Sequence, residues 1–140
     1  MTALAKLGFH RDGEAIVGSI AGEIDISNAT DLGAALEGAV PPPAIGLVLD
    51  LSQATYIDSA GVHLLFRLGA RLTRRRQQLR VVVPETAAIR RVVNLAGVHW
   101  TVPRDGTVGE ALVNLRAEIS PKRGEESWVS GPDAPYYYDE

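Results

Sequence analysis

The N-terminal part of the chain has the alternating pattern of two short β-strands. Residues 4–20 flank Asp12-Gly13, a dipeptide that tolerates the positive φ angles of a tight hairpin turn. In the second of these strands, residues 15–20, both alternating faces are largely apolar, which favours a position inside a sheet. The pattern therefore predicts an N-terminal antiparallel hairpin whose second strand has neighbours on both sides.

The rest of the chain switches between short apolar runs and stretches in which apolar residues recur every three or four positions. The runs are typical of buried strands and the periodic stretches of helices that pack on a sheet. A T-x-x-E capping box, Thr107 to Glu110, starts the last helix. Helices are predicted at 27–40, 59–72, 86–96 and 107–119, and strands at 45–51, 79–83 and 98–102.

The order of these elements, β-β-α-β-α-β-α-β-α, predicts a single α/β domain. The regular alternation after the hairpin implies parallel strands joined by right-handed helical crossovers. We expect a mixed, mostly parallel sheet of about five strands with about four helices. This domain is predicted to span residues 1–119. Residues 120–140 contain three prolines and many charges without periodicity, so a flexible C-terminal tail is predicted there.

Length, charge and cysteine content narrow the class of protein. The chain has 140 residues, enough for one globular domain, and a formal net charge of −3, whereas a general nucleic-acid surface needs a basic excess. It has no cysteine, so a disulfide framework and a thiolate metal site are excluded. No stretch approaches the ~20 apolar residues of a membrane span, and the N-terminus lacks the apolar core of a signal peptide. We expect a cytoplasmic protein that binds neither nucleic acid nor membrane directly.

The stretch "IDSAG" at 57–61 lies where a run of β-type residues meets a helical pattern. Asp58 or Ser59 can cap that helix, a contribution of ~1 kcal/mol. The two small residues that follow leave the serine hydroxyl uncovered, and the free amides and dipole of a helix N-terminus favour an anion there. Phosphorylation would add roughly −1.5 to −2 charge next to Asp58 and Asp25. We interpret the junction as a binding face that a phosphate group turns off.

Several of these features together resemble a known family. "GEID" at 22–25, "IGLVLDLSQATYIDSAGV" at 45–62 and the order of elements resemble a STAS domain of the anti-sigma factor antagonist type. The resemblance covers residues 4–119, and the D-S-x-G sequence is its most specific part. It implies a non-enzymatic binding protein without a cofactor of its own, because in that family the nucleotide belongs to the partner.

The resemblance also implies a phosphorylation switch. In that family the serine of D-S-x-G is phosphorylated by a partner that is both anti-sigma factor and serine kinase, and the unphosphorylated form binds this partner and frees the sigma factor. A serine phosphatase acts on the phosphorylated form. Ser59 is then the phosphoacceptor, Asp58 shapes its loop, Gly61 permits close approach and Asp25 lies nearby. The residues expected to bind the partner are Asp25, Asp58, Ser59, Ala60, Gly61, Val62 and His63.

His63 allows a different interpretation of the same serine. It stands where close relatives often carry glycine, and it follows Ser59 by four residues, so the two side chains can share a helix face. A serine hydrolase that uses both is a remote alternative, because D-S-A-G lacks the G-x-S-x-G elbow and no oxyanion hole is evident. A receiver domain with Asp50 as phosphoacceptor is disfavoured, because the required acidic pair and lysine are missing.

Two further features lie outside the resemblance. A cluster of arginines is assigned to the end of the second predicted helix, where cations complement the helix dipole, and docking of an acidic partner is the alternative. Aromatic residues in the tail are either a partner motif or incidental. The three histidines lack ligand spacing, so no metal site is expected. The arginines are Arg71, Arg74, Arg75, Arg76 and Arg80, and the aromatic residues are Trp128 and Tyr136, Tyr137 and Tyr138.

The sequence as a whole predicts a bacterial regulatory binding module. It would act in a partner-switching circuit that controls sigma-factor-dependent transcription, with the phosphate on Ser59 as its state. The alternative is a STAS adaptor in a stress-sensing or transport-accessory complex that Ser59 phosphorylation does not control.

Overall fold

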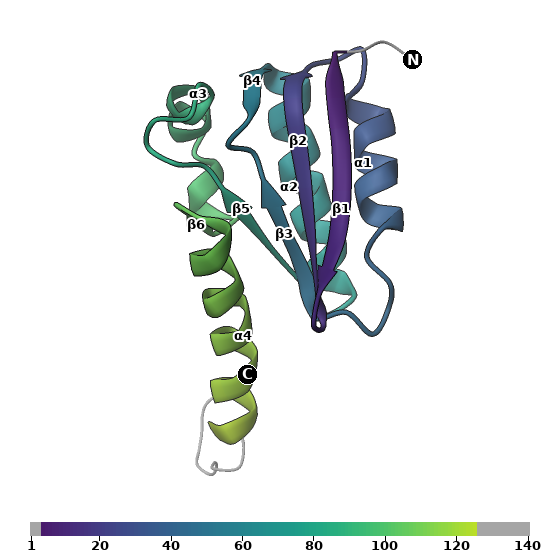
Figure 1. Ribbon diagram of the computed structural model, residues 1–140, viewed down its shortest axis with the longest axis vertical. Helices are drawn as coiled ribbons and strands as arrows, with labels where there is room; N and C mark the ends of the chain where they lie inside the picture. The colour runs from purple at the N-terminus through teal and green to yellow at the C-terminus, as the bar shows by residue number, and fades with distance from the viewer. Residues whose placement is uncertain (1–3, 126–140) are drawn as a thin grey trace.

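The centre of the fold is a six-stranded mixed sheet (Figure 1). A computed structural model describes residues 4–125, with side chains through Glu118. β1 and β2 form the antiparallel hairpin, and all other paired strands are parallel, in the order β1-β2-β3-β5-β6. β2 is long enough to pair first with β3 and then with β4. The strands are β1 (Ala5–Asp12), β2 (Ala15–Ile24), β3 (Gly46–Asp50), β4 (Ala54–Ile57), β5 (Gln78–Val82) and β6 (Arg104–Asp105).

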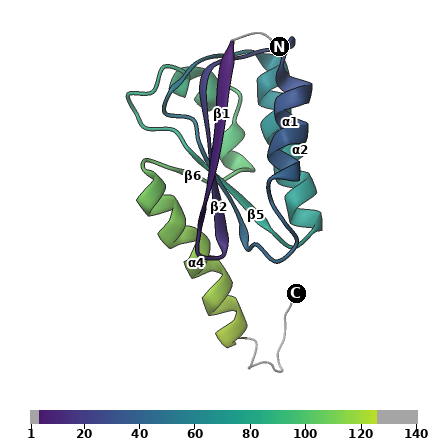
Figure 2. The same ribbon diagram turned by 45° about the vertical axis from the view of Figure 1, so that its right-hand side comes forward.

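Helices cover both faces of this sheet. α1, α2 and the short α3 pack on one face, and α4 crosses the other (Figures 1 and 2). No helix within residues 4–125 has both the length and the apolar character needed to cross a membrane. The predicted α/β class and the N-terminal hairpin are confirmed. The helices are α1 (Ala29–Gly38), α2 (Ser59–Arg74), α3 (Arg90–Leu95), the 3-10 turn η1 (Val98–Trp100) and α4 (Val108–Glu125).

The sheet separates two apolar cores of unequal size. Alternate residues of β2 point to opposite sides, so that Ile16 and Ile20 join the larger core under α1 and α2, while Val17 joins the smaller core under α4. Leu65 and Leu72 of α2 are fully buried in the larger core. This two-sided burial explains why β3 and the first part of β2 have almost continuous apolar sequences.

The prediction of a strand at residues 98–102 is wrong. In a strand, residues 98, 100 and 102 would share one face, but Val98 and Val102 are buried while the Trp100 side chain is 82% exposed. The amide of Val102 donates to the carbonyl of Val98, and this helical turn brings the two valines to the same side. The strand that pairs with β5 is Arg104–Asp105.

Some element boundaries also differ from prediction. The short strand β4 was not predicted, because its two inner residues, Thr55 and Tyr56, are both exposed and break the period-two pattern. Helix α3 is shorter than the predicted 86–96. Helix α4 continues to Glu125, past the predicted end at 119, and the remainder of the predicted tail lies outside the described residues.

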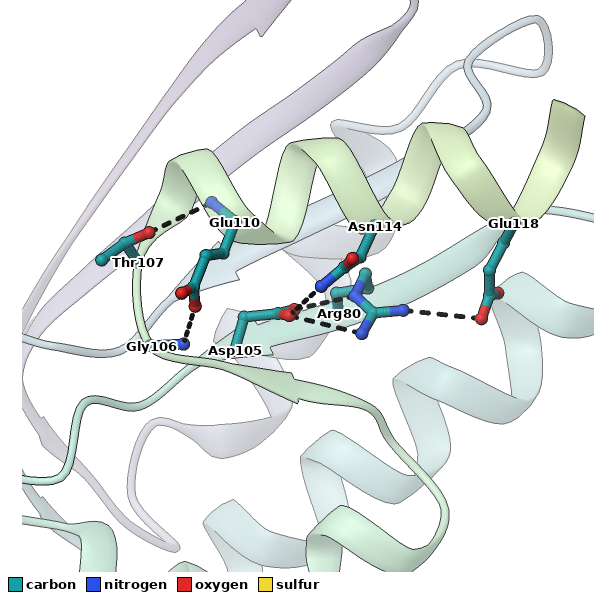
Figure 3. Close-up of polar contacts among 7 residues, drawn as sticks. All are labelled: Arg80, Asp105, Gly106, Thr107, Glu110, Asn114 and Glu118. Carbon is teal, nitrogen blue, oxygen red and sulfur yellow. Dashed lines mark hydrogen bonds and ion pairs between the residues drawn. The ribbon is translucent and has the colours of Figure 1, made fainter.

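The prediction that Arg80 lies with the arginines at the end of α2 is wrong. Arg80 lies on β5, is 9% exposed, and donates from Nε to Oδ2 of Asp105 over 2.7 Å. Asn114 of α4 donates to Oδ1 of the same carboxylate over 2.6 Å, and Glu118 lies 3.6 Å from Nη1 of Arg80 (Figure 3). This network ties α4 to the sheet at a buried position.

The capping box at the start of α4 is confirmed with one difference. The hydroxyl of Thr107 accepts from the amide of Glu110 over 3.1 Å, as predicted (Figure 3). The Glu110 carboxylate accepts from the amide of Gly106, one residue before the cap, over 3.0 Å. Both ends of the box therefore satisfy amides that the helix itself leaves free.

Candidate functional site

Ser59 is the first residue of α2 and is exposed to solvent. The residue before it, Asp58, has the extended backbone of an N-cap, with φ −108° and ψ −169°. The Ser59 hydroxyl makes no hydrogen bond to the part of the chain whose side chains are described, residues 4–118. The hydroxyl is therefore accessible to another protein at the tip of the helix.

The amides at this tip are not free, which corrects the interpretation based on the sequence. Oδ1 of Asp58 accepts hydrogen bonds from the amides of Ala60 and Gly61, over 2.9 and 3.1 Å. A phosphate group on Ser59 would thus meet a carboxylate that already occupies the first amides of the helix. Its negative charges would add to that of Asp58 instead of finding an empty anion site.

Asp58 also joins two loops that are far apart in the sequence. Its Oδ2 accepts from the amide of Ile26 over 3.2 Å, and its own amide donates to the carbonyl of Ile24. The neighbouring Asp25 accepts from the amide and hydroxyl of Ser27, over 2.9 and 2.6 Å. The structure therefore brings the loop of Asp25 beside the start of α2, as expected.

Two further residues of this loop, Ile26 and Asn28, belong to the site and were not predicted from the sequence. Asn28 directly precedes α1, but its side chain does not cap this helix: it accepts from the amide of Asp25 and donates to the carbonyl of Glu23, and the residue is 3% exposed. Ile26 is 80% exposed, directly beside the tip of α2. The sequence signal for this exposed apolar residue is the second isoleucine, Ile26, in the otherwise polar end of the stretch "GEIDIS".

Gly61 has an internal role in the structure. It is buried, and a Cβ atom at this position would lie 2.5 Å from Cγ1 of Ile57 and 3.0 Å from Cγ2 of Ile24. The missing side chain lets the first turn of α2 pack directly on the ends of β2 and β4. Val62 is buried too, so both residues position the tip, while Ser59 and His63 present exposed side chains.

Substitution of Gly61 by alanine is expected to lower the free energy of unfolding by about 1–3 kcal/mol, because the added methyl group overpacks the site. Urea denaturation followed by circular dichroism would measure this. Gly38, at the end of α1, is the matched control, since a Cβ there meets no atom within 4 Å. Gly38→Ala should leave the stability equal or higher, and equal stability losses in both variants would contradict the packing argument.

A groove of about 330 Å³ runs between α1 and α2, starting at the tip of α2. Ile26, Ala60 and His63 line its end near Ser59, and Glu37 and Arg71 line the opposite end, where they form a 3.0 Å ion pair. In the described part of the chain no hydrogen bond links His63 to Ser59. The pair that the hydrolase alternative requires is therefore not joined in this structure.

Comparisons with known proteins agree on the family. The family described as "Mlab, STAS domain" matches residues 7–103. An anti-sigma factor antagonist from Mycobacterium paratuberculosis shares 31% identity and a TM-score of 0.68, over 80% of this chain and 94% of that chain. No curated protein matches this chain.

Two structures of lower identity share the fold alone. The anti-sigma factor antagonist SpoIIAA in its unphosphorylated form is 18% identical, with a TM-score of 0.63 over 80% of this chain and 97% of that chain. A sulfate transporter family protein from Wolinella succinogenes is 14% identical, with a TM-score of 0.65 over 78% and 90% of the two chains.

The fold, the D-S-x-G junction at the start of α2 and the family match lead to one conclusion. This chain belongs to the STAS domain family. The predictions of the family and of its fold are confirmed. The fold also occurs in a sulfate transporter family protein, so the fold alone does not decide the function, and the function rests on the site.

Proposed function

We propose that this protein is an anti-sigma factor antagonist whose binding to an anti-sigma factor is switched off by phosphorylation of Ser59. The observation that carries the proposal is the exposed Ser59 hydroxyl at the tip of α2, next to Asp58 in the chain and near the loop that contains Asp25. The relative with 31% identity, which is described as an anti-sigma factor antagonist, supports it.

In the unphosphorylated state the tip of α2 is a suitable docking surface. Ser59 and Ile26 are exposed there, and the groove between α1 and α2 opens beside them. The hydrogen bonds of Asp58 to both sides of the tip hold these groups in place, which reduces the entropy lost on binding.

Phosphorylation changes the charge of this surface more than its shape. A phosphate group on Ser59 adds roughly −1.5 to −2 charge. Because Asp58 already occupies the amides of Ala60 and Gly61, the added charge is not neutralised by the helix tip. A partner docked over the tip would have to desolvate this cluster of negative charge, and it dissociates instead.

The proposal assigns the chemistry to the partners. An anti-sigma factor with serine kinase activity binds ATP and transfers the phosphoryl group to Ser59, and a serine phosphatase removes it. This chain is a cytoplasmic binding protein without a cofactor, enzymatic activity or direct contact to nucleic acid. Asp25, Asp58 and His63 join Ser59 and Ala60 in the partner surface, and the buried Gly61 and Val62 position it.

The phosphorylation step can be tested by intact-mass spectrometry. The purified chain is incubated with ATP and candidate anti-sigma factor kinases, and we expect a single added phosphate in the wild type and none in Ser59→Ala. Ser27→Ala is the matched control, because Ser27 is an exposed serine in the facing loop and should leave phosphorylation unchanged. Phosphate that persists in Ser59→Ala would refute the assignment.

A STAS adaptor is the second candidate function. The observation in its favour is the shared fold with a sulfate transporter family protein, together with a groove that can bind a partner without any phosphate. A chain that remains unmodified by every kinase tested but still binds a partner through α1 and α2 would support the adaptor.

A further inference from the structure

The groove between α1 and α2 has an apolar floor, and the proposed switch at Ser59 involves only one end of this groove. Ala29, Gly33, Leu64 and Leu68 contribute to its lining. Its volume of about 330 Å³ lies within the range of pockets that bind ligands, roughly 300–1,000 Å³. It extends along α1 and α2 from the tip near Ser59 to the ion pair of Glu37 and Arg71, and so is long enough for an extended peptide segment.

Positive charge accumulates at the far end of this groove. Arg71 pairs with Glu37, and Arg75 donates to the carbonyl of the same residue. Arg74 and Arg76 are exposed and have no partner among the side chains that the structure describes, those of residues 4–118. Arg76 has a left-handed backbone with φ 61°, a conformation that favours glycine at the end of a helix. We call Arg71, Arg74, Arg75 and Arg76 the arginine cluster. Its positive charge is larger than the charge that the Glu37 carboxylate neutralises.

The complementary partner is present in the same chain. Residues 126–140 contain four acidic residues and no lysine or arginine. The same segment carries Trp128 and three consecutive tyrosines, Tyr136 to Tyr138. An acidic, aromatic segment matches both the arginine cluster and the apolar floor, since aromatic side chains are strong anchors in apolar grooves.

The described part of α4 leads toward this end of the domain. Arg116 pairs with Asp12 at the tip of the β1–β2 hairpin, over 2.9 Å. The loop after α2 lies at the same end, because Gln77 donates to the carbonyls of Pro41 and Ala44 in the loop that precedes β3. Figures 1 and 2 show that α4 extends toward the side of the domain at which α1 and α2 end, and that its far end projects well beyond them. Fifteen residues span up to about 50 Å when extended, which suffices to follow the groove.

We infer that residues 126–140 dock on the arginine cluster and lay their aromatic side chains in the groove between α1 and α2 of the same chain. The docked segment approaches Ile26, Ala60 and His63, so it competes with any protein that binds at the tip of α2. The docking itself does not depend on phosphorylation of Ser59. It therefore goes beyond the proposed function and can be tested separately.

Tryptophan fluorescence of the full chain tests the inference. Trp100→Phe leaves Trp128 as the only tryptophan and costs no core packing, because Trp100 is exposed. In this background we expect blue-shifted Trp128 emission and weak quenching by acrylamide. Arg74→Glu with Arg76→Glu should shift the emission to that of free tryptophan and raise the quenching constant several-fold. The matched control, Arg11→Glu with Arg91→Glu, changes the net charge equally at exposed sites outside the groove and should have no effect.

A second pair of variants tests the groove itself. Ala34→Glu places a charge in the groove and should release Trp128, whereas Ala70→Glu, on an exposed position of α2 outside the groove, should not. A signal that is unchanged on dilution supports docking within one chain, and loss on dilution would show that a second copy provides the groove. Solvent-like emission in the parent chain, or equal responses to test and control variants, would overturn the inference while leaving the Ser59 switch untouched.

Discussion

Replacement of Asp105 by alanine is expected to lower the free energy of unfolding by about 3–5 kcal/mol, the usual cost of removing one partner of a buried ion pair. The Arg80 guanidinium would keep its buried position on β5 but lose the carboxylate that accepts from Nε at 2.7 Å. Asn114 of α4 would lose its acceptor as well. The nearest remaining carboxylate, that of Glu118, lies 3.6 Å away and is about half exposed, so it replaces little of the lost interaction.

Urea denaturation followed by circular dichroism would measure this change. The matched control is Asp12→Ala, which removes one partner of the exposed Asp12–Arg116 ion pair and should cost about 0–1 kcal/mol. A second variant, Arg80→Met with Asp105→Leu, removes both charges at once and should recover most of the lost stability. Equal effects of Asp105→Ala and Asp12→Ala would show that the buried network does not hold α4 to the sheet.

The substitution Ser59→Asp is expected to weaken binding to the anti-sigma partner by about 100-fold or more, because like charges at an interface cost several kcal/mol. The new carboxylate would stand beside Asp58, whose Oδ1 already holds the amides of Ala60 and Gly61. The fold should keep its stability within about 0.5 kcal/mol, because Ser59 is exposed and an acidic residue suits the first turn of a helix.

Isothermal titration calorimetry with the purified partner would measure the affinity. Ser59→Asn is the matched control, because it has the size of aspartate without its charge and should lose far less affinity. Unchanged binding of Ser59→Asp would argue strongly against control by charge. If Asn weakens binding as much as Asp, the effect is steric, and the electrostatic account of the switch fails.

Much of the fold could be read from local patterns. The period-two runs and the Asp12-Gly13 turn predict the hairpin of β1 and β2, and helical periodicity predicts α2 from Ser59 onward. These patterns are informative because each residue's burial depends on its own position in a strand or helix. The same reasoning failed at 98–102, where alternating valines fit both a strand and a single helical turn, and only the packing of Val98 and Val102 distinguishes them.

The sequence by itself determined the class of fold, the position of Ser59 at the start of a helix and the small residues that leave its hydroxyl uncovered. The tertiary structure alone decided which partners the charged side chains of Arg80 and Asp58 contact. Arg80 and Asp105 are 25 positions apart, and Asp58 is 32 positions from Ile26. Local periodicity contains no information on such pairs, because they form only when the strands have paired into the sheet and the helices have packed on its faces. The same packing produces the groove beside Ser59, because its walls come from α1 and α2, which are separated in the sequence by β3 and β4.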